Sequence, residues 1–285
     1  MAGTDIYHSV PQASRIQKRL VLNQCFKTVE EIVGRLDSLV YVTFGGAELY
    51  DVMDLVAVFD VRRQRLAIVS YEQDGAVAES SQRCPVASTL SQIETVRVII
   101  VPSAFFDQAA PLHELRLRGR FIYFLDDTRP FSAIQANKLG ELLRADLLRA
   151  GDFLLITSCI TPRVMHQPKF MADQVETFKL FFGSNCNPDR DFKVRNHVDL
   201  LLALTLSKHD RVISVAGSTL SRLRATLLRK FKYRDTRAAM GLWLFEIGQT
   251  TLRTVRLVDK ELEPFPLAFT HRPEEEIPDI FDSIN

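Results

Sequence analysis

Residues 42–51 read VTFGGAELYD and stand between an apolar run and a helical pattern. The run SLVYVTF, residues 38–44, is typical of a buried strand. The following stretch, residues 47–61, predicts a helix with an apolar side formed by Leu49, Met53, Leu55, Val56 and Phe59. A strand that passes to a helix through Gly45 and Gly46 brings backbone N–H groups close to a ligand at the strand's carboxyl end. The same glycine pair can instead form only a tight turn.

Four further apolar runs have strand character, and helical patterns separate most of them. The runs are RLAIVSYEQD (65–74), TVRVIIVPS (95–103), GRFIYFLDDT (119–128) and DFLLITSCI (152–160). The segment 131–151 predicts the clearest helix, with Ser132 as N-cap and Gly151 as C-terminal stop. This alternation predicts a doubly wound, mostly parallel Rossmann-like sheet, with its ligand crevice beyond the carboxyl ends of the strands.

The remainder of the chain divides into four parts around this sheet. Residues 1–37 predict an N-terminal helical segment of one or two helices, ahead of a Rossmann-like domain over 38–250. Residues 161–192 are rich in Pro, Asn and polar side chains, which indicates an insertion or a lid. Two strand-like runs, 223–236 and 241–248, predict a terminal antiparallel hairpin. Residues 251–285 form a C-terminal extension in which four prolines limit regular structure.

Composition narrows the class of protein. The chain has 36 Lys and Arg against 35 Asp and Glu, so no global field attracts nucleic acid or a membrane. Four cysteines lie far apart, and six histidines lack metal-ligand spacing, so we expect reduced, buried thiols and no metal site. No leader or membrane-spanning pattern occurs, so we expect a cytoplasmic protein.

Acidic residues follow the second predicted strand. Glu72 lies 27 residues after Gly45, and Asp74 comes two residues later. A carboxylate at this place can accept hydrogen bonds from both hydroxyls of a ribose. The alternative is a solvated strand end, in which Asp74 caps the following helix.

The order of these elements is similar to the Rossmann-like class of S-adenosylmethionine-dependent methyltransferases over roughly residues 36 to 248. The motifs that carry the resemblance are TFGGAEL, YEQD, VPSAFF and FLDD, followed by the terminal hairpin. The resemblance implies S-adenosylmethionine as cofactor, with the substrate beside Asp126 and Asp127. It places the cofactor against a set of strand-end residues: Thr43, Phe44, Gly45, Gly46, Glu48, Glu72, Asp74, Ser103, Ala104 and Phe105.

The chain departs from this family's pattern at two strand ends. The family's first strand ends in an acidic residue ahead of three spaced glycines, whereas Thr43 stands there and two adjacent glycines follow. The fourth strand ends in LDDTRPF, which lacks the motifs of enzymes that methylate nucleobases. Asp126 or Asp127 can act as a general base, or bind a metal that orients the substrate. Alternatively, one caps the next helix and the other is solvated.

Residues 222–237 are the densest basic stretch, with Lys230, Lys232 and Arg234 predicted on one strand face and Phe231 and Tyr233 on the other. This basic strip either binds along the phosphates of a nucleic acid or protects an edge strand from aggregation.

The sequence thus predicts a methyltransferase of unknown substrate. The alternative is a catalytically inactive relative that binds an adenine nucleotide or a partner associated with nucleic acid. A nicotinamide-dependent oxidoreductase is disfavoured because GxGxxG is missing.

Overall fold

The computed structural model describes residues 12–34, 38–44, 46, 48–61, 64–104, 108–116, 119–126, 139, 141–142, 145–159, 221–235 and 238–251. Its helices are α1 (Gln12–Val33), α2 (Tyr50–Val58), α3 (Gly75–Arg83), α4 (Pro85–Leu90) and α5 (Ala110–Arg116). Its strands are β1 (Ser38–Thr43), β2 (Arg65–Tyr71), β3 (Val96–Val101), β4 (Arg120–Leu125), β5 (Phe153–Cys159), β6 (Ser221–Asp235) and β7 (Ala238–Thr251). The predicted Ser132 cap, the lid at 161–192 and the extension beyond Thr251 lie outside the described residues.

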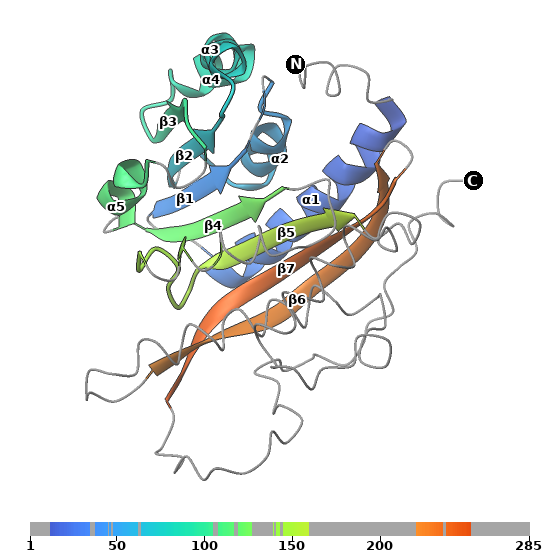
Figure 1. Cartoon of the computed structure of the whole chain (residues 1–285), viewed down its shortest axis with the longest axis vertical. Coiled ribbons are helices and arrows are strands. Elements are labelled where there is room, and N and C mark those ends of the chain that lie inside the picture. Colours follow the sequence, from blue (N-terminus) through green and yellow to red (C-terminus); the bar gives the residue numbers. More distant parts are fainter. Residues whose placement is uncertain are drawn as a thin grey trace, which may run out of the picture.

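The strands form one seven-stranded sheet in the order β3-β2-β1-β4-β5-β7-β6 (Figure 1). Strands β1 to β5 pair in parallel, whereas β7 runs antiparallel to both β5 and β6. The strand order reverses direction at β1, where β1 lies between β2 and β4. The predicted fold is therefore confirmed: a doubly wound, mostly parallel sheet that ends in an antiparallel hairpin.

The register places the functional strand ends at the same edge of the sheet. Thr43 pairs with Ser70, and Val42 pairs with Tyr123. Leu125 in turn pairs with Ile156 of β5. Because parallel strands keep their carboxyl ends together, the residues that follow β1, β2 and β4 meet along this edge.

Two hydrophobic cores cover the two faces of the sheet. On one face, α1, α2 and α4 pack against side chains such as Tyr41 and Phe124. On the other face, α5 and the side chains of Leu139, Leu142, Leu147 and Leu148 pack against residues such as Val42 and Tyr123. Figure 1 shows α1 crossing its face of the sheet, and α1 contacts both α2 and β6. Alternate residues of β1 and β4 thus point to opposite cores, as the two-residue period of a strand requires.

Helix α2 buries most of its predicted apolar side, with Leu49, Leu55 and Phe59 in the core, and it differs from the prediction at one residue. Met53, predicted in the core, is 38 % exposed, whereas Asp51 and Asp54 are buried. Hydrophobic spacing misplaced Met53 because two acidic residues face the sheet and α1. Their burial requires polar partners, which the site supplies.

The segment before β5 also differs from the prediction. Residues 145–150 form turns rather than a helix that continues to Gly151, and Asp146 has a left-handed backbone with φ of 54°. An Asp tolerates this conformation better than most side chains do, so it can end a helix as Gly often does.

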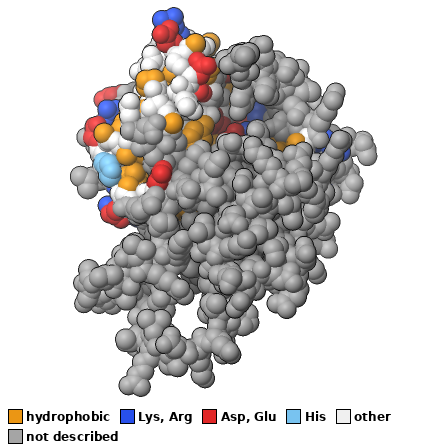
Figure 2. Space-filling model, in the orientation of Figure 1, with side chains coloured by type: hydrophobic (Ala, Val, Ile, Leu, Met, Phe, Trp, Pro, Cys, Tyr) orange, Lys and Arg blue, Asp and Glu red, His pale blue; other side chains and the backbone are white. Residues whose placement is uncertain are grey.

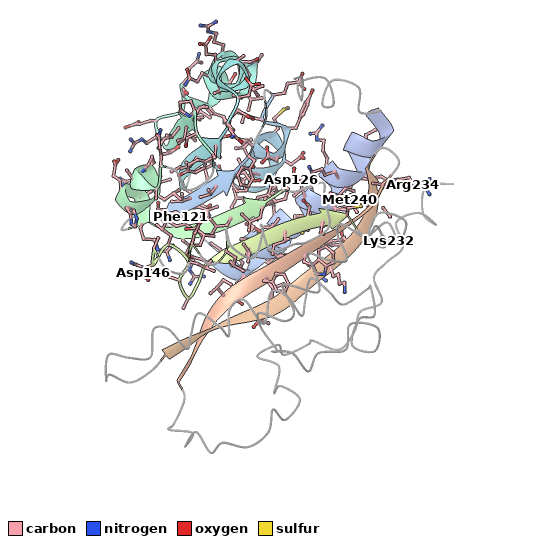
Figure 3. All side chains as sticks on the ribbon, viewed as in Figure 1. Phe121, Asp126, Asp146, Lys232, Arg234 and Met240 are labelled. Atoms are coloured by element: carbon pink, nitrogen blue, oxygen red, sulfur yellow. The ribbon has the colours of Figure 1, made fainter. Side chains whose placement is uncertain are left out.

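The terminal hairpin confirms the predicted alternation on β6 in part. Phe231 and Tyr233 are buried in the core beneath α1. Lys230 and Lys232 are half-buried rather than fully solvent-facing, and only Arg234 of the three basic residues is exposed (Figure 3). The Lys230 ammonium lies 5.7 Å from the centre of the Trp243 ring.

The predicted reduced, buried thiols are confirmed for Cys25, Cys84 and Cys159.

Candidate functional site

The carboxylate of Asp126 lies directly after β4, at the carboxyl edge of the sheet (Figure 3). Its Oδ2 accepts a hydrogen bond from Lys18 Nζ of α1 at 2.5 Å, and its Oδ1 accepts one from the Thr157 hydroxyl of β5 at 2.6 Å. The Asp126 and Lys18 side chains are 19 % and 24 % exposed. Both oxygens of this predicted catalytic residue are therefore engaged. Asp127 lies outside the described residues.

A second carboxylate, that of Asp51, lies at the end of β1. Its Oδ2 accepts hydrogen bonds from two hydroxyls of β1, that of Tyr41 at 2.7 Å and that of Thr43 at 2.5 Å. Tyr41 and Thr43 point to the same face because they are two residues apart on a strand. The first turn of α2 thus supplies an acidic group at the strand end where Thr43 replaces the acid of the resembled family.

Burial raises the pKa of both the Asp51 carboxyl and the Tyr41 phenol. Burial raises the pKa of the Asp51 carboxyl above its ordinary value, and the negative charge of Asp126 raises it further. The hydroxyls of Thr43 and Tyr41 and the Lys18 ammonium act in the opposite direction. The pKa of the Tyr41 phenol is well above its ordinary value, chiefly through burial. Tyr41 is therefore a neutral donor to Asp51.

Helix α1 holds α2 through a second ion pair. Arg19 Nε donates to Asp54 Oδ1 at 2.9 Å and to Oδ2 at 3.2 Å. Burial raises the pKa of Asp54, and Arg19 opposes this effect. Lys18 and Arg19 are neighbours on α1, and each contacts a different carboxylate at this edge of the sheet. α1 is thus part of the site and not a separate appendage.

The loop after β1 has the conformation that its glycine favours. Gly46 has φ of +57°, and a side chain built on it would meet nothing within 4 Å. Its carbonyl accepts a hydrogen bond from the Ser81 hydroxyl of α3 at 2.8 Å. Leu49 also has a left-handed backbone, with φ of 50°, just before α2. Phe44 packs against the core on the α5 face, and Gly45 lies outside the described residues.

The acidic residues after β2 form a local capping arrangement. Glu72 is half-buried, and its Oε1 accepts a hydrogen bond from the Asp74 backbone N–H at 3.1 Å. Asp74 is the N-cap of α3 and accepts from the N–H groups of Ala76 and Val77 at 2.9 and 3.3 Å. Glu72 is thus held at the carboxyl edge with its orientation fixed by a backbone donor. Asp74 has the helix-capping geometry of the alternative prediction.

The remaining predicted residues lie at the margins of this edge. Ser103 and Ala104 follow β3 and are half-buried, with the Ser103 hydroxyl donating to the Ala104 carbonyl at 3.0 Å. Phe105 lies outside the described residues. Glu48 is exposed and lines an open hollow of about 490 Å³ beside α3 and α4. This hollow contains none of the predicted cofactor residues other than Glu48, so it is not the predicted crevice.

Two features are absent from the described part of the chain. No group of three or more His, Cys, Asp and Glu side chains there can hold a metal ion. No helix in the same part is both long and apolar enough to cross a membrane. On the face shown in Figure 2, acidic, basic and hydrophobic side chains of the described residues are interspersed. On that face the described acidic and basic side chains thus do not separate into patches of one charge.

Several polar residues of this site were not predicted from the sequence, among them Lys18, Asp51 and Thr157. Lys18 belongs to an amphipathic helix, where a lysine usually marks the solvated side. Asp51 has a usable signal, because the helix YDVMDLVAV carries two acids three residues apart among apolar side chains. An acid pair at that spacing lies on one helix face and requires partners if that face is buried.

No family model matches the chain, and no curated protein matches it. Its structure is similar to the SAH-bound methyltransferase PaMTH1 of Podospora anserina, with 14 % identity, coverage of 86 % of this chain and 84 % of that chain, and a TM-score of 0.38. It is also similar to the magnesium protoporphyrin IX methyltransferase of Synechocystis with bound SAH, with 8 % identity, coverage of 82 % and 84 %, and a TM-score of 0.44.

A putative class I S-adenosylmethionine-dependent methyltransferase from Listeria monocytogenes has 7 % identity, coverage of 90 % of this chain and 66 % of that chain, and a TM-score of 0.43. These identities and TM-scores are low, so only the strand order and the side chains of this chain can support a function. A fold by itself carries many functions, whereas a site restricts them.

Proposed function

We propose that the protein is an S-adenosylmethionine-dependent methyltransferase. The observation that carries this proposal is the sheet order β3-β2-β1-β4-β5-β7-β6 with β7 reversed, because this is the arrangement that the resemblance predicts. An open sheet of this kind binds ligands beyond its carboxyl ends, at the point where the strand order changes direction. That point lies at β1, beside Thr43 and Gly46.

The side chains at this edge support a nucleoside ligand. Glu72 follows β2, the neighbour of β1, and presents a half-buried carboxylate whose Oε1 is oriented by the Asp74 N–H. A carboxylate can accept hydrogen bonds from two adjacent hydroxyls, which suits a ribose. In this proposal the loop at Gly46 approaches the amino-acid part of the cofactor, and Ser103 with Ala104 flank the adenine. Asp126 faces the substrate.

The second candidate is a catalytically inactive relative that binds the nucleoside as an assembly subunit. A specific observation favours it: both oxygens of Asp126 are engaged, by Lys18 and by Thr157. A proton from a substrate would have to reach a remaining lone pair on an oxygen that already accepts from a cation or a hydroxyl. The basic strip of residues 222–237 and the cytoplasmic location stay predictions in both cases.

A calorimetric titration tests the cofactor. We expect the purified chain to bind S-adenosylmethionine and S-adenosylhomocysteine (SAH) and not to bind NAD. Tight NAD binding, or no heat with either adenosyl ligand, contradicts the proposal. Transfer of a labelled methyl group from S-adenosylmethionine to an acceptor in cell extracts then separates the two candidates. Cofactor binding without such transfer favours the inactive relative.

A further inference from the structure

Two cations and three carboxylates meet where α1 and α2 cover the carboxyl edge of the sheet. Lys18 pairs with Asp126, and the Nζ to Oδ2 distance is 2.5 Å. Arg19 pairs with Asp54, and the Nη2 to Oδ1 distance is 2.9 Å. Asp51 has no ion pair with any described residue. Lys18 and Arg19 are thus each already paired with a carboxylate other than Asp51. Of the three carboxylates, Asp51 is the one that has no ion pair with a described residue.

The two oxygens of Asp51 have different environments. Oδ2 accepts two hydrogen bonds, from the hydroxyls of Tyr41 and Thr43. Oδ1 accepts none from the described residues, although the whole residue is only 9 % exposed. The two hydroxyls therefore fix the orientation of the carboxylate and leave one oxygen able to accept a further donor.

A buried carboxylate without a cation has a large desolvation cost, and two neutral hydroxyls offset it only in part. The direction of the pKa shift at Asp51 agrees, because burial outweighs the hydrogen bonds there. A structural role would be served as well by a neutral Asn, which also accepts hydrogen bonds from hydroxyls. An acid at this place is better explained by a positively charged group that binds beside it.

We propose that Asp51 binds the ammonium group at the amino-acid end of S-adenosylmethionine, with Thr43 and Tyr41 as positioning residues that orient its carboxylate. This inference rests on the proposed function. The adenosine part of that cofactor carries no positive charge near neutral pH, and its ribose is assigned to Glu72 on the neighbouring strand. The charged amino-acid end then extends toward β1, where Asp51 lies. Thr43, expected to touch the cofactor, instead acts through Asp51.

The test compares a ligand that has the amino-acid end with one that lacks it. SAH and 5′-methylthioadenosine share the adenosine part, and both are titrated into the wild-type chain, Asp51→Asn and Glu94→Gln. We expect Asp51→Asn to bind SAH roughly 10- to 100-fold more weakly, the range of one charge-assisted hydrogen bond, and to bind methylthioadenosine within about 2-fold of the wild type. Glu94→Gln removes the same charge from an exposed acid outside the site and should bind both ligands like the wild type.

The outcomes separate this inference from the proposed function. If the wild type binds neither ligand, the proposed function fails. If the wild type binds both and Asp51→Asn retains full affinity for SAH, only the role of Asp51 fails. Equal weakening of both ligands by Asp51→Asn also contradicts that role, because it indicates a structural effect.

A second variant covers the case in which Asp51→Asn does not fold. Thr43→Val removes one of the two hydroxyls that orient the carboxylate and keeps the shape of the side chain. It should weaken SAH binding and spare methylthioadenosine. The same weakening for both ligands contradicts the inference.

Discussion

The Thr43 hydroxyl donates to the Asp51 carboxylate at 2.5 Å, which joins the last residue of β1 to the first turn of α2. The acid at the end of the first strand is therefore supplied from eight residues further along the chain. Because Tyr41 donates to the same oxygen, the carboxylate is held by a strand and presented by a helix. This arrangement is consistent with the proposed role of Asp51 as the acid that binds a cation at this edge, where position 43 lacks one.

The first prediction concerns the pH dependence of stability at Asp51. The pKa of its carboxyl in the folded protein is raised, chiefly by burial. A raised pKa gives stability that is present below the ordinary value of about 3.9 and is lost as the pH rises through the folded value. Asn cannot ionise and can still accept from Tyr41 and Thr43. Asp51→Asn should therefore be more stable than the wild type near neutral pH, by on the order of 1 kcal/mol.

The stability difference between Asp51→Asn and the wild type should shrink as the pH is lowered, because the folded-state carboxyl takes up a proton at a higher pH than the unfolded one. Urea unfolding at a series of pH values measures it. The other charged groups that face Asp51, namely Lys18, Asp54 and Asp126, are present in both proteins. A difference that stays constant with pH would show that the carboxylate is not strained by its burial.

The second prediction concerns the backbone at Gly46. Gly46 and Gly34 have φ of +57° and +58°, and a side chain built on either meets nothing within 4 Å. Alanine at either position should cost about 1 kcal/mol in the free energy of unfolding, since both adopt the left-handed conformation. Only Gly46→Ala should also weaken SAH binding, because Gly34 follows α1. If calorimetry finds the same SAH affinity in both variants, the glycine is only a turn residue.

Periodicity predicted the sheet well because buried strands carry continuous apolar side chains. All five parallel strands and the hairpin follow from such runs, from SLVYVT in β1 to FLLITSC in β5. The site was harder to predict, since its polar side chains break the rule by which apolar residues face inward. Asp51 lies on the buried face of α2 and Met53 on the exposed one, and only the partners Tyr41 and Thr43 make that arrangement favourable. Contacts across 108 residues, as between Lys18 and Asp126, leave no local pattern.

The third prediction concerns the ribose. Glu72→Ala removes the carboxylate that the proposal assigns to two ribose hydroxyls, at a cost of about 2–4 kcal/mol in the free energy of binding. Both SAH and methylthioadenosine should be affected, because both contain the ribose, which distinguishes this variant from Asp51→Asn. Glu94→Ala changes an exposed acid and should bind both ligands like the wild type. Wild-type affinity in a folded Glu72→Ala protein would exclude Glu72 from the site.

The fourth prediction concerns the opposite edge of the sheet. Arg116 forms a bidentate ion pair with Asp152, with Nη1 donating to Oδ1 at 2.9 Å and Nη2 donating to Oδ2 at 2.7 Å. The two side chains are 6 % and 2 % exposed. Arg116→Met leaves the Asp152 carboxylate buried without a cation, which should cost about 3–5 kcal/mol of stability. Arg97→Met breaks an ion pair with Glu114 in which both side chains are about half exposed, and should cost about 0–1 kcal/mol. Equal unfolding midpoints for the two variants would contradict this ranking.

The last prediction asks whether Asp126 takes part in chemistry. If it is a general base, Asp126→Asn should lower methyl transfer to an acceptor by roughly 10²-fold or more, because Asn keeps the size and loses the basic group. SAH binding should persist, since the proposed contacts of the cofactor lie at Asp51 and Glu72. Thr157→Val provides the matched comparison: it frees Oδ1 of Asp126 from its hydroxyl donor and leaves the ion pair with Lys18 in place. If the base acts through Oδ1, Thr157→Val frees a lone pair on that oxygen but also removes the hydroxyl that orients it. These two effects oppose each other, so the rate of methyl transfer should differ from the wild-type rate far less in Thr157→Val than in Asp126→Asn. Transfer at the wild-type rate by Asp126→Asn would show that this acid serves only to anchor α1 over the sheet.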